Sequence, residues 1–404
     1  MERTLRAGRM ATFVYFGLSG FILGMWVVHI PSIEHRTGID HAELGRLLLL
    51  LGAGSFAGMQ AIGPLTDRFG ARRVVPIGAA LSGVAVVGPG LATNAWTLGA
   101  ALAVLGACNG GGLNVGMNAH AVQVERGYGR PVMSAFHATY SIGGVLASLV
   151  GAATLGAGVR PAVTLTAVAV LCVAVAVAAA PALLRPEPAR ATAGAAARRR
   201  TPWRIWALAA LALVIMLCEG VANDWSALHL RRVLDAPAAT AALAYGAFAT
   251  TMTIGRLLAD RAAARLGAVA VLRYGASAAA LGMAAAALSP WIPLALAGWA
   301  VFGAGLSGCV PQLFSAAGHA DRDAAGVNVS RVAGIGYLGM LAGPAAIGAL
   351  TGVMPLNLTF FLPVACCVAA AAAAGILRPG AGTAGSVPEA AVDAAGGRAE
   401  GRCG

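Results

Sequence analysis

One carboxylate, Glu219, lies deep within the long apolar stretch 205–229, a position that suits a group carrying protons. It follows Arg204 by fifteen residues, which is roughly 22 Å along a helix. A lone carboxylate costs about 3 kcal/mol at membrane depth, so it needs a cavity or a partner. We expect Glu219 to couple proton movement. The alternative is a structural hydrogen bond, to Asn223 one turn on.

His29 is a second candidate for proton movement, because imidazole changes its charge near neutral pH. It lies in the first apolar stretch of the chain. A lone histidine in a membrane is more often simply hydrogen bonded, so that interpretation stays open beside the first.

Amide side chains in other apolar stretches are candidates for binding a polar solute. Asn114 and Asn118 are four residues apart and share one helical face, while Asn223 and Gln312 lie in later stretches. Amides offer both donors and acceptors to a ligand. They also commonly bridge neighbouring membrane helices, so solute binding and helix bridging are equal alternatives.

Charged residues interrupt the apolar sequence at two corresponding places. Asp67 and Arg68, followed by Arg72, separate two apolar stretches, and Asp260 and Arg261 do the same about one half-chain later. An offset of 194 residues also superposes Asn118 on Gln312 and His137 on Arg331. These coincidences predict an internal repeat.

The composition indicates a membrane protein. Apolar residues make up 58% of the 404 residues, charged residues 11%, and the mean hydropathy is +0.77, which leaves too little polar surface for a soluble globule. We count twelve apolar runs long enough to cross a bilayer, and uninterrupted runs of this kind are helices rather than barrel strands. The sequence therefore predicts an all-α membrane protein with twelve transmembrane helices.

The positive charge gives the expected orientation. The net charge of +12 is carried by arginine, since the chain has no lysine, and the arginines cluster between apolar runs. This fits the positive-inside rule better than binding of nucleic acid, and it places both termini in the cytoplasm. We expect two pseudo-symmetric six-helix bundles, 1–184 and 205–377, joined by a cytoplasmic linker, 185–204, and followed by a disordered tail, 378–404.

The first charged interruption carries a family signature. Gly63-Pro-Leu-Thr-Asp67-Arg68-Phe-Gly70-Ala-Arg72-Arg73 resembles the G-x-L-x-D-R-x-G-R-R motif of the major facilitator superfamily, and the copy at Arg256-Leu-Leu-Ala-Asp260-Arg261 is degenerate. Met117-Asn-Ala-His-Ala-Val-Gln-Val-Glu125-Arg and Glu219-Gly-Val-Ala-Asn-Asp224-Trp-Ser226 are similar to the bacterial YbjJ-like branch.

The resemblance implies a division of roles among the spans. The first, fourth, seventh and tenth would line a central cavity, and the second, fifth, eighth and eleventh would form the contact between halves. Asp67 would cap the start of span eleven. The residues expected to act in gating are Asp67, Arg68, Arg72, Arg126, His137, Asp260, Arg261 and Arg331. For Arg331 the alternative is that it binds an acidic group of the solute.

These observations predict a secondary active transporter in the bacterial cytoplasmic membrane, not an enzyme. We expect a monomer that moves a small polar solute by alternating access, coupled to protons and without a cofactor. The alternative function is a membrane sensor or assembly protein that keeps this fold without transporting.

Overall fold

The computed structural model describes residues 2–39, 41–185, 201–321 and 324–378, and these parts are helical with short connections. Lipid offers no hydrogen-bond partner to a bare peptide group, so the apolar runs satisfy their own backbone as helices. The expected linker and tail lie almost entirely in 186–200 and 379–404, outside the described residues.

The N-terminal half contains six spans, some of them built from more than one helical segment. Its elements are α1 (Glu2–Thr37), α2 (His41–Phe69), α3 (Ala71–Ala85), α4 (Val87–Leu91), α5 (Ala95–Gly106), the π-helical segment η1 (Ala107–Leu113), α6 (Asn114–Tyr128), α7 (Met133–Gly156), α8 (Pro161–Ala179) and the 3-10 turn η2 (Ala180–Ala182).

The C-terminal half repeats this order. Its elements are α10 (Trp203–Val233), α11 (Ala238–Leu266), α12 (Ala268–Leu288), α13 (Ile292–Leu306), α14 (Cys309–Ala320), α15 (Ala325–Leu350), α16 (Leu356–Thr359), α17 (Phe361–Ala373) and the 3-10 turn η3 (Ala374–Leu377).

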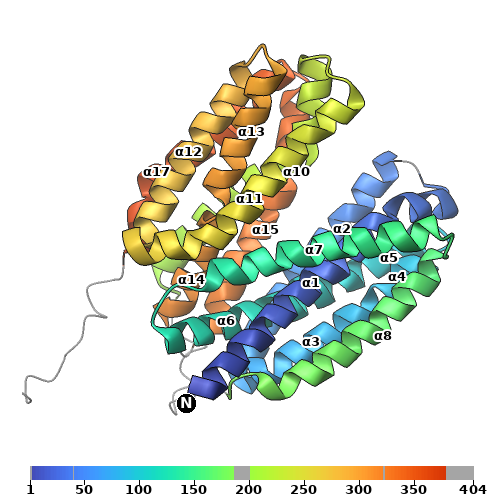
Figure 1. Ribbon diagram of the computed structural model, residues 1–404, viewed down its shortest axis with the longest axis vertical. Helices are drawn as coiled ribbons and strands as arrows, with labels where there is room; N and C mark the ends of the chain where they lie inside the picture. Colours follow the sequence, from blue (N-terminus) through green and yellow to red (C-terminus); the bar gives the residue numbers. More distant parts are fainter. Residues whose placement is uncertain (1, 40, 186–200, 322–323, 379–404) are drawn as a thin grey trace, which may run out of the picture.

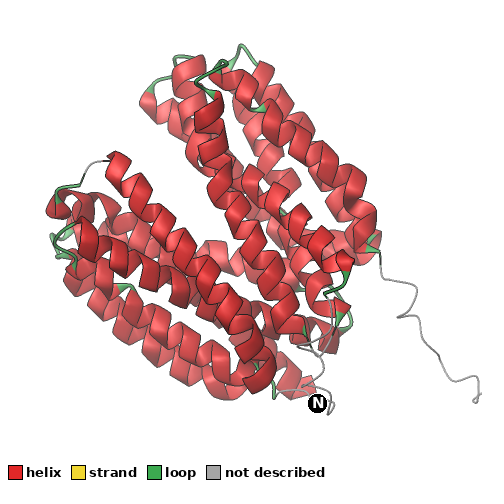
Figure 2. Cartoon of the chain, turned by 180° about the vertical axis from the view of Figure 1, so that it is seen from behind, coloured by secondary structure: helices red, strands yellow, loops and turns green. Residues whose placement is uncertain are grey.

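Each half has its own apolar core, as two bundles require. One cluster of buried side chains extends from Ala11 to Leu183 and includes only Val329 from the other half, and the second is built mainly from 205–377. The halves lie side by side near the start of the chain and diverge toward the opposite end (Figures 1 and 2). The two-bundle, twelve-helix prediction is confirmed.

Eleven of the described helical stretches are long and apolar enough to cross a membrane, and α11 falls outside this set. Its first 18 residues include four threonines and a tyrosine, and charged residues occupy its last three turns. It is nevertheless 29 residues long and packs against α10, α12 and α13 as the eighth span.

The internal repeat is visible in close helix contacts. A Cβ on Gly20 of α1 would lie 1.9 Å from the Tyr140 carbonyl oxygen on α7, and one on Gly220 of α10 would lie 2.2 Å from that of Met340 on α15. Gly220 follows Gly20 by 200 positions and Met340 follows Tyr140 by the same number, so the two helix pairs approach at equivalent glycines.

A second set of contacts gives a different offset. A Cβ on Gly106 would lie 2.0 Å from the Leu51 carbonyl oxygen, and one on Gly303 would lie 2.3 Å from that of Phe248. These pairs differ by 197 positions and relate α2 and the fourth span to α11 and the tenth span.

The offset of 194 expected from the sequence is therefore wrong, although the repeat itself exists. At an offset of 200, His137 corresponds to Tyr337 rather than to Arg331, and at 197 Asn118 corresponds to Ser315. The helix starts do not follow the offset of the packed glycines, since α15 begins at Ala325, eight residues earlier than an offset of 200 from the start of α7 would place it.

Candidate functional site

Glu219 forms an ion pair within the C-terminal half, and the arginine of this pair is hydrogen bonded to the N-terminal half. Glu219 Oε1 on α10 accepts a hydrogen bond from an Arg256 terminal nitrogen on α11, at 3.1 Å. The other terminal nitrogen of Arg256 donates to Ser141 Oγ on α7, at 3.0 Å. The two charged side chains are 15% and 12% exposed, so a charge pair lies largely out of water between the halves.

Close helix packing positions this pair. Gly220, the residue after Glu219, allows α10 to lie against the Met340 carbonyl of α15. Three tyrosines, Tyr140 of α7, Tyr245 of α11 and Tyr337 of α15, lie within electrostatic range of Glu219. Tyrosine hydroxyl groups from three helices are therefore among the polar neighbours of the pair.

The sequence-based alternative for Glu219, a hydrogen bond to Asn223, is not what the structure has. Arg256 provides the partner instead, and Asn223 lies one turn further along α10 in a half-buried position. The sequence analysis did not include Arg256 among the candidate site residues, although its position indicates a partner. It lies one turn before Asp260 within an apolar run, where an unpaired arginine is costly.

A chain of polar side chains links α6 to α7 beside the ion pair. Asn118 Nδ2 donates to the carbonyl and side-chain oxygens of Asn114, at 2.9 and 3.2 Å, and Asn118 Oδ1 contacts His137 Nε2 at 3.2 Å. The His137 ring packs against Phe16 of α1 and Phe314 of α14. The structure thus brings together two residues expected to bind solute and one expected to gate.

The fourth and tenth spans are both irregular beside these residues. The π-helical segment η1 directly precedes Asn114, and the tenth span breaks between α13 and α14, just before Gln312. At an offset of 197, η1 corresponds to 304–310, which contains that break. π-Helical turns within α-helices often occur at functional sites, because they release backbone groups from regular pairing.

Two aspartates cap helices of the opposite half. Asp67 of α2 accepts hydrogen bonds from the backbone nitrogens of Gly326 and Val327 at the start of α15, at 2.7 and 3.0 Å. Asp260 of α11 accepts from those of Ser134 and Ala135 at the start of α7, at 2.9 and 2.7 Å. A carboxylate at a helix N-terminus is stabilised by unpaired N–H groups and by the helix dipole.

The two caps lie at different depths. Asp67 precedes Gly70, where α2 ends, by three residues, whereas Asp260 precedes the equivalent Gly267 by seven. Both glycines have positive φ, 79° and 83°, and turn the chain into the next helix. Asp260 is one helical turn further from the helix end because α7, its partner, starts later than α15.

A third contact closes the same end. Glu125 of α6 accepts from the backbone nitrogens of Val132 and Met133, at 2.9 and 3.0 Å, and also from Ser315 Oγ of α14. Arg126 of α6 donates to the Gly318 carbonyl, which also lies on α14. Together with the aspartate caps, these bonds join the halves at the end where the chain begins.

The remaining expected site residues are more scattered. His29 is fully buried, and its Nδ1 lies 2.7 Å from the Met25 carbonyl within α1. Gln312 is 4% exposed and lies two residues before Phe314. Arg331 lies in electrostatic range of Asp67, Arg68 stacks on Phe69, Arg72 is half-buried and Arg261 is exposed.

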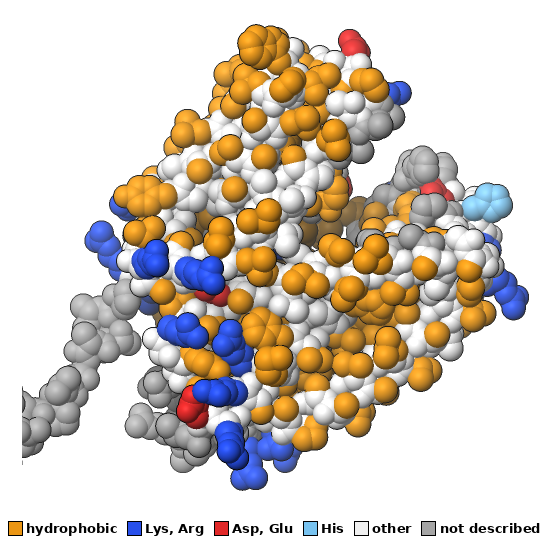
Figure 3. Space-filling view, in the orientation of Figure 1, with side chains coloured by type: hydrophobic (Ala, Val, Ile, Leu, Met, Phe, Trp, Pro, Cys, Tyr) orange, Lys and Arg blue, Asp and Glu red, His pale blue; other side chains and the backbone are white. Residues whose placement is uncertain are grey.

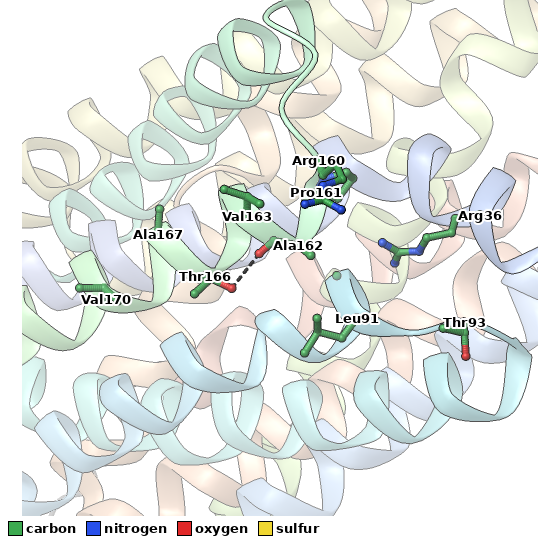
Figure 4. A pocket seen from close by; sticks show the side chains of 11 residues that line it. Arg36, Leu91, Thr93, Arg160, Pro161, Ala162, Val163, Thr166, Ala167 and Val170 are labelled. Atoms are coloured by element: carbon green, nitrogen blue, oxygen red, sulfur yellow. Dashed lines mark hydrogen bonds between the residues drawn. The ribbon is translucent and has the colours of Figure 1, made fainter.

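A separate pocket of about 740 Å³ has no lining residue in common with the ion pair (Figure 4). It is open and is formed by the end of α1, the end of α4 and the start of α8, with Arg36 and Arg160 at its polar side. Arg36 donates to the Pro89 and Ala92 carbonyls. Within the described residues, no group of three or more His, Cys, Asp or Glu side chains is placed to hold a metal ion.

Comparison with known proteins assigns the family. The sequence matches the Major Facilitator Superfamily over residues 10–344. It is 34% identical over 352 residues, 87% of this chain and 91% of the other, to a protein of Yersinia pestis described as an uncharacterized MFS-type transporter. The chain belongs to the major facilitator superfamily.

Other matches agree with this membership. An uncharacterized transporter of Sinorhizobium fredii, y4wD, is 32% identical over 349 residues, 86% of this chain and 92% of that protein. The fold is similar to that of FucP in its outward conformation, with a TM-score of 0.77 at 14% identity over 92% of this chain and 98% of that one.

Membership in the superfamily confirms several expectations. The protein is a multi-pass membrane protein of a transporter family, and its relatives are transporters rather than enzymes. The narrower resemblance to the YbjJ-like branch stays a prediction.

Proposed function

We propose that this protein is a proton-coupled secondary transporter of a small polar solute, with Glu219 as the proton-coupling group. The observation that carries the proposal is the hydrogen-bonded chain Glu219–Arg256–Ser141, which places a titratable carboxylate within the contact between halves. Protonation of Glu219 removes one charge of the pair and so alters a bond network that spans both halves.

The gating residues support alternating access. The caps at Asp67 and Asp260 hold the halves together at one end, while the surface is hollowed between the halves at the other (Figure 3). Most arginine side chains visible in that view lie toward the closed end, which under the positive-inside rule is cytoplasmic. In this proposal both termini are cytoplasmic and the hollow faces outward, in a bacterial cytoplasmic membrane.

Rocking of the halves about the central residues would carry the solute across. The buried amides Asn114 and Asn118 and the half-buried His137 are candidates to hydrogen bond it, and Asn223 and Gln312 are further candidates on the C-terminal half. We propose that the transporter works as a monomer, because each half contributes one side of the site.

The test is uptake of a panel of small polar solutes into proteoliposomes with an imposed pH gradient. Glu219→Gln should abolish accumulation above the equilibrium level, while exchange of labelled for unlabelled solute continues. Asp224→Asn is the matched control, since Asp224 is an exposed acid on the same helix, and it should accumulate solute within about twofold of the native level.

Two outcomes would overturn the proposal. Full accumulation by Glu219→Gln would remove Glu219 from proton coupling. Solute binding by the native protein without flux in either direction would favour the sensor or assembly function.

A further inference from the structure

We infer that the transported solute carries an anionic group, a carboxylate being the chemistry that fits, and that Arg256 binds this group when Glu219 is protonated. This inference rests on the proposed function and assigns its substrate class. The hydrogen-bond donors of Arg256 are unequally used.

Arg256 has spare hydrogen-bonding capacity in a largely buried place. Its terminal nitrogens bind Glu219 and Ser141, and its Nε is buried without a partner. A guanidinium presents five N–H donors in a fixed plane and cannot lose its charge in a protein. Its geometry matches a carboxylate through two parallel bonds, and the edge formed by Nε and one terminal nitrogen is the edge that Glu219 only half occupies.

The charge balance then decides between solute classes. When Glu219 takes up a proton, the buried cation loses the acid paired with it, and an uncompensated buried charge is strongly unfavourable. A neutral polar solute leaves that charge unmatched, whereas an anion restores the pair. By linkage, proton binding at Glu219 and anion binding at Arg256 must strengthen each other by the same factor.

The groups around the pair leave this role open. Asp260, one turn from Arg256, already accepts two backbone bonds from α7. Asp224 lies exposed on α10. The other titratable side chains within electrostatic range of the pair are His137, Tyr140, Tyr245, Cys309 and Tyr337.

The cycle is balanced in protons and charge. Glu219 takes a proton on the side where the solute enters, its bond to Arg256 weakens, and the solute anion binds the guanidinium. After the halves rock, Glu219 releases the proton on the other side, recovers Arg256 and displaces the anion. One proton moves with one negative charge, so transport of a monoanion is electroneutral.

The experiment compares small monocarboxylates of two to six carbons with their neutral amides in proteoliposomes. With an imposed pH gradient, we expect at least one carboxylate to accumulate tenfold or more above its amide. The rate should stay within about twofold when a potassium gradient with valinomycin imposes a membrane potential. Acceleration of carboxylate or amide uptake by an inside-negative potential would show net positive charge movement and overturn the inference.

Variants of Arg256 and Glu219 distinguish the role of the cation from that of the carboxylate. Arg256→Gln should lose both accumulation and exchange of the carboxylate, Arg256→Lys should retain weaker exchange, and Glu219→Gln should keep exchange but lose accumulation. Arg265→Gln, at an exposed arginine on the same helix, is the control and should behave as the native protein. Carboxylate exchange by Arg256→Gln at the native rate would overturn the inference.

A readout without transport covers variants that reconstitute poorly. Adding the carboxylate to purified native protein in weakly buffered detergent should cause uptake of about one proton per protein, which Glu219→Gln should lack. If amides are accumulated by the pH gradient and carboxylates are neither bound nor moved, the substrate class is wrong while the proposed function stands. If the gradient drives no solute of either class, the proposed function fails as well.

Discussion

Glu219 and His29 are the first and second sequence-based candidates for proton movement, and they differ in what surrounds them. Glu219 shares a hydrogen bond with a cation and, through it, with the other half. His29 binds a carbonyl of its own helix, one turn back, and its Nε2 is buried without a partner. A proton carrier needs a contact that changes with its charge, and among these two residues Glu219 has such a contact, with Arg256.

Replacing His29 with leucine tests this difference. The Met25 carbonyl keeps its helical partner, and removal of a buried, half-paired imidazole should be nearly neutral for stability. We expect the unfolding midpoint in detergent to stay within about 4 °C of the native value and gradient-driven uptake to stay within about twofold. A well-folded His29→Leu protein without uptake would place His29 in the proton route.

Among the helices, the tightest associations are between a span of one bundle and another span of the same bundle. The contact of α1 with α7 at Gly20 and that of α10 with α15 at Gly220 leave no room for a side chain. Such close approach replaces the hydrophobic effect, which is absent between helices in lipid, with dispersion contacts. It also fixes Tyr140 and Ser141 relative to the ion pair, because they lie at the same turn of α7.

A glycine comparison measures the packing directly. Gly20→Ala would place a methyl group 1.9 Å from the Tyr140 carbonyl oxygen, and we expect it to destabilise the protein by about 1–3 kcal/mol. Gly246→Ala in α11, with no atom within 4 Å of the added carbon, should be neutral or stabilise by roughly 0.5–1 kcal/mol. Thermal unfolding in detergent, followed by tryptophan fluorescence, gives both values. Equal midpoints for the two variants would contradict the close approach of α1 and α7.

In the whole molecule, the two aspartate caps form a latch between bundles that otherwise have separate cores. Each carboxylate uses both oxygens on the first N–H groups of a helix in the opposite half. Opening this end must break four such bonds, while the other end is already apart (Figure 1). The balance between the two conformations therefore depends on a few polar contacts of modest strength.

Neutralising the caps should shift this balance. Asp67→Asn and Asp260→Asn each remove a charge–dipole interaction worth about 1 kcal/mol, which is roughly a fivefold change in the ratio of conformations. Spin labels can be attached at the exposed positions Arg130 and Arg265, one on each half near the latch. Double electron–electron resonance should then show a larger population of long distances between the two labels. Asp224→Asn serves as the control. An unchanged distance distribution in the double variant would mean that the caps do not hold the halves together.

The sequence by itself determined the class of the protein and its repeated plan. Apolar runs of membrane length must become helices, since lipid leaves the backbone no other partner, and Asp67 and Asp260 mark the last part of the second helix in each half. Glu219 was identifiable as a candidate for a similar reason, because a buried charge is too costly to lack a partner. These inferences depend on local composition, which the chain carries in any arrangement.

Only the tertiary structure decided which residues meet. Arg256 pairs with Glu219 across 37 positions of sequence, Asp260 reaches α7 across more than a hundred, and neither distance is encoded in helical periodicity. The offset between repeated positions is 200 or 197 residues rather than 194, and it is set by the glycines at which two backbones approach closely. The early start of α15 does not follow this offset. Interaction partners and the register of the repeat are set by packing between helices. Packing depends on helix surfaces that are distant in the sequence and meet only in the folded protein.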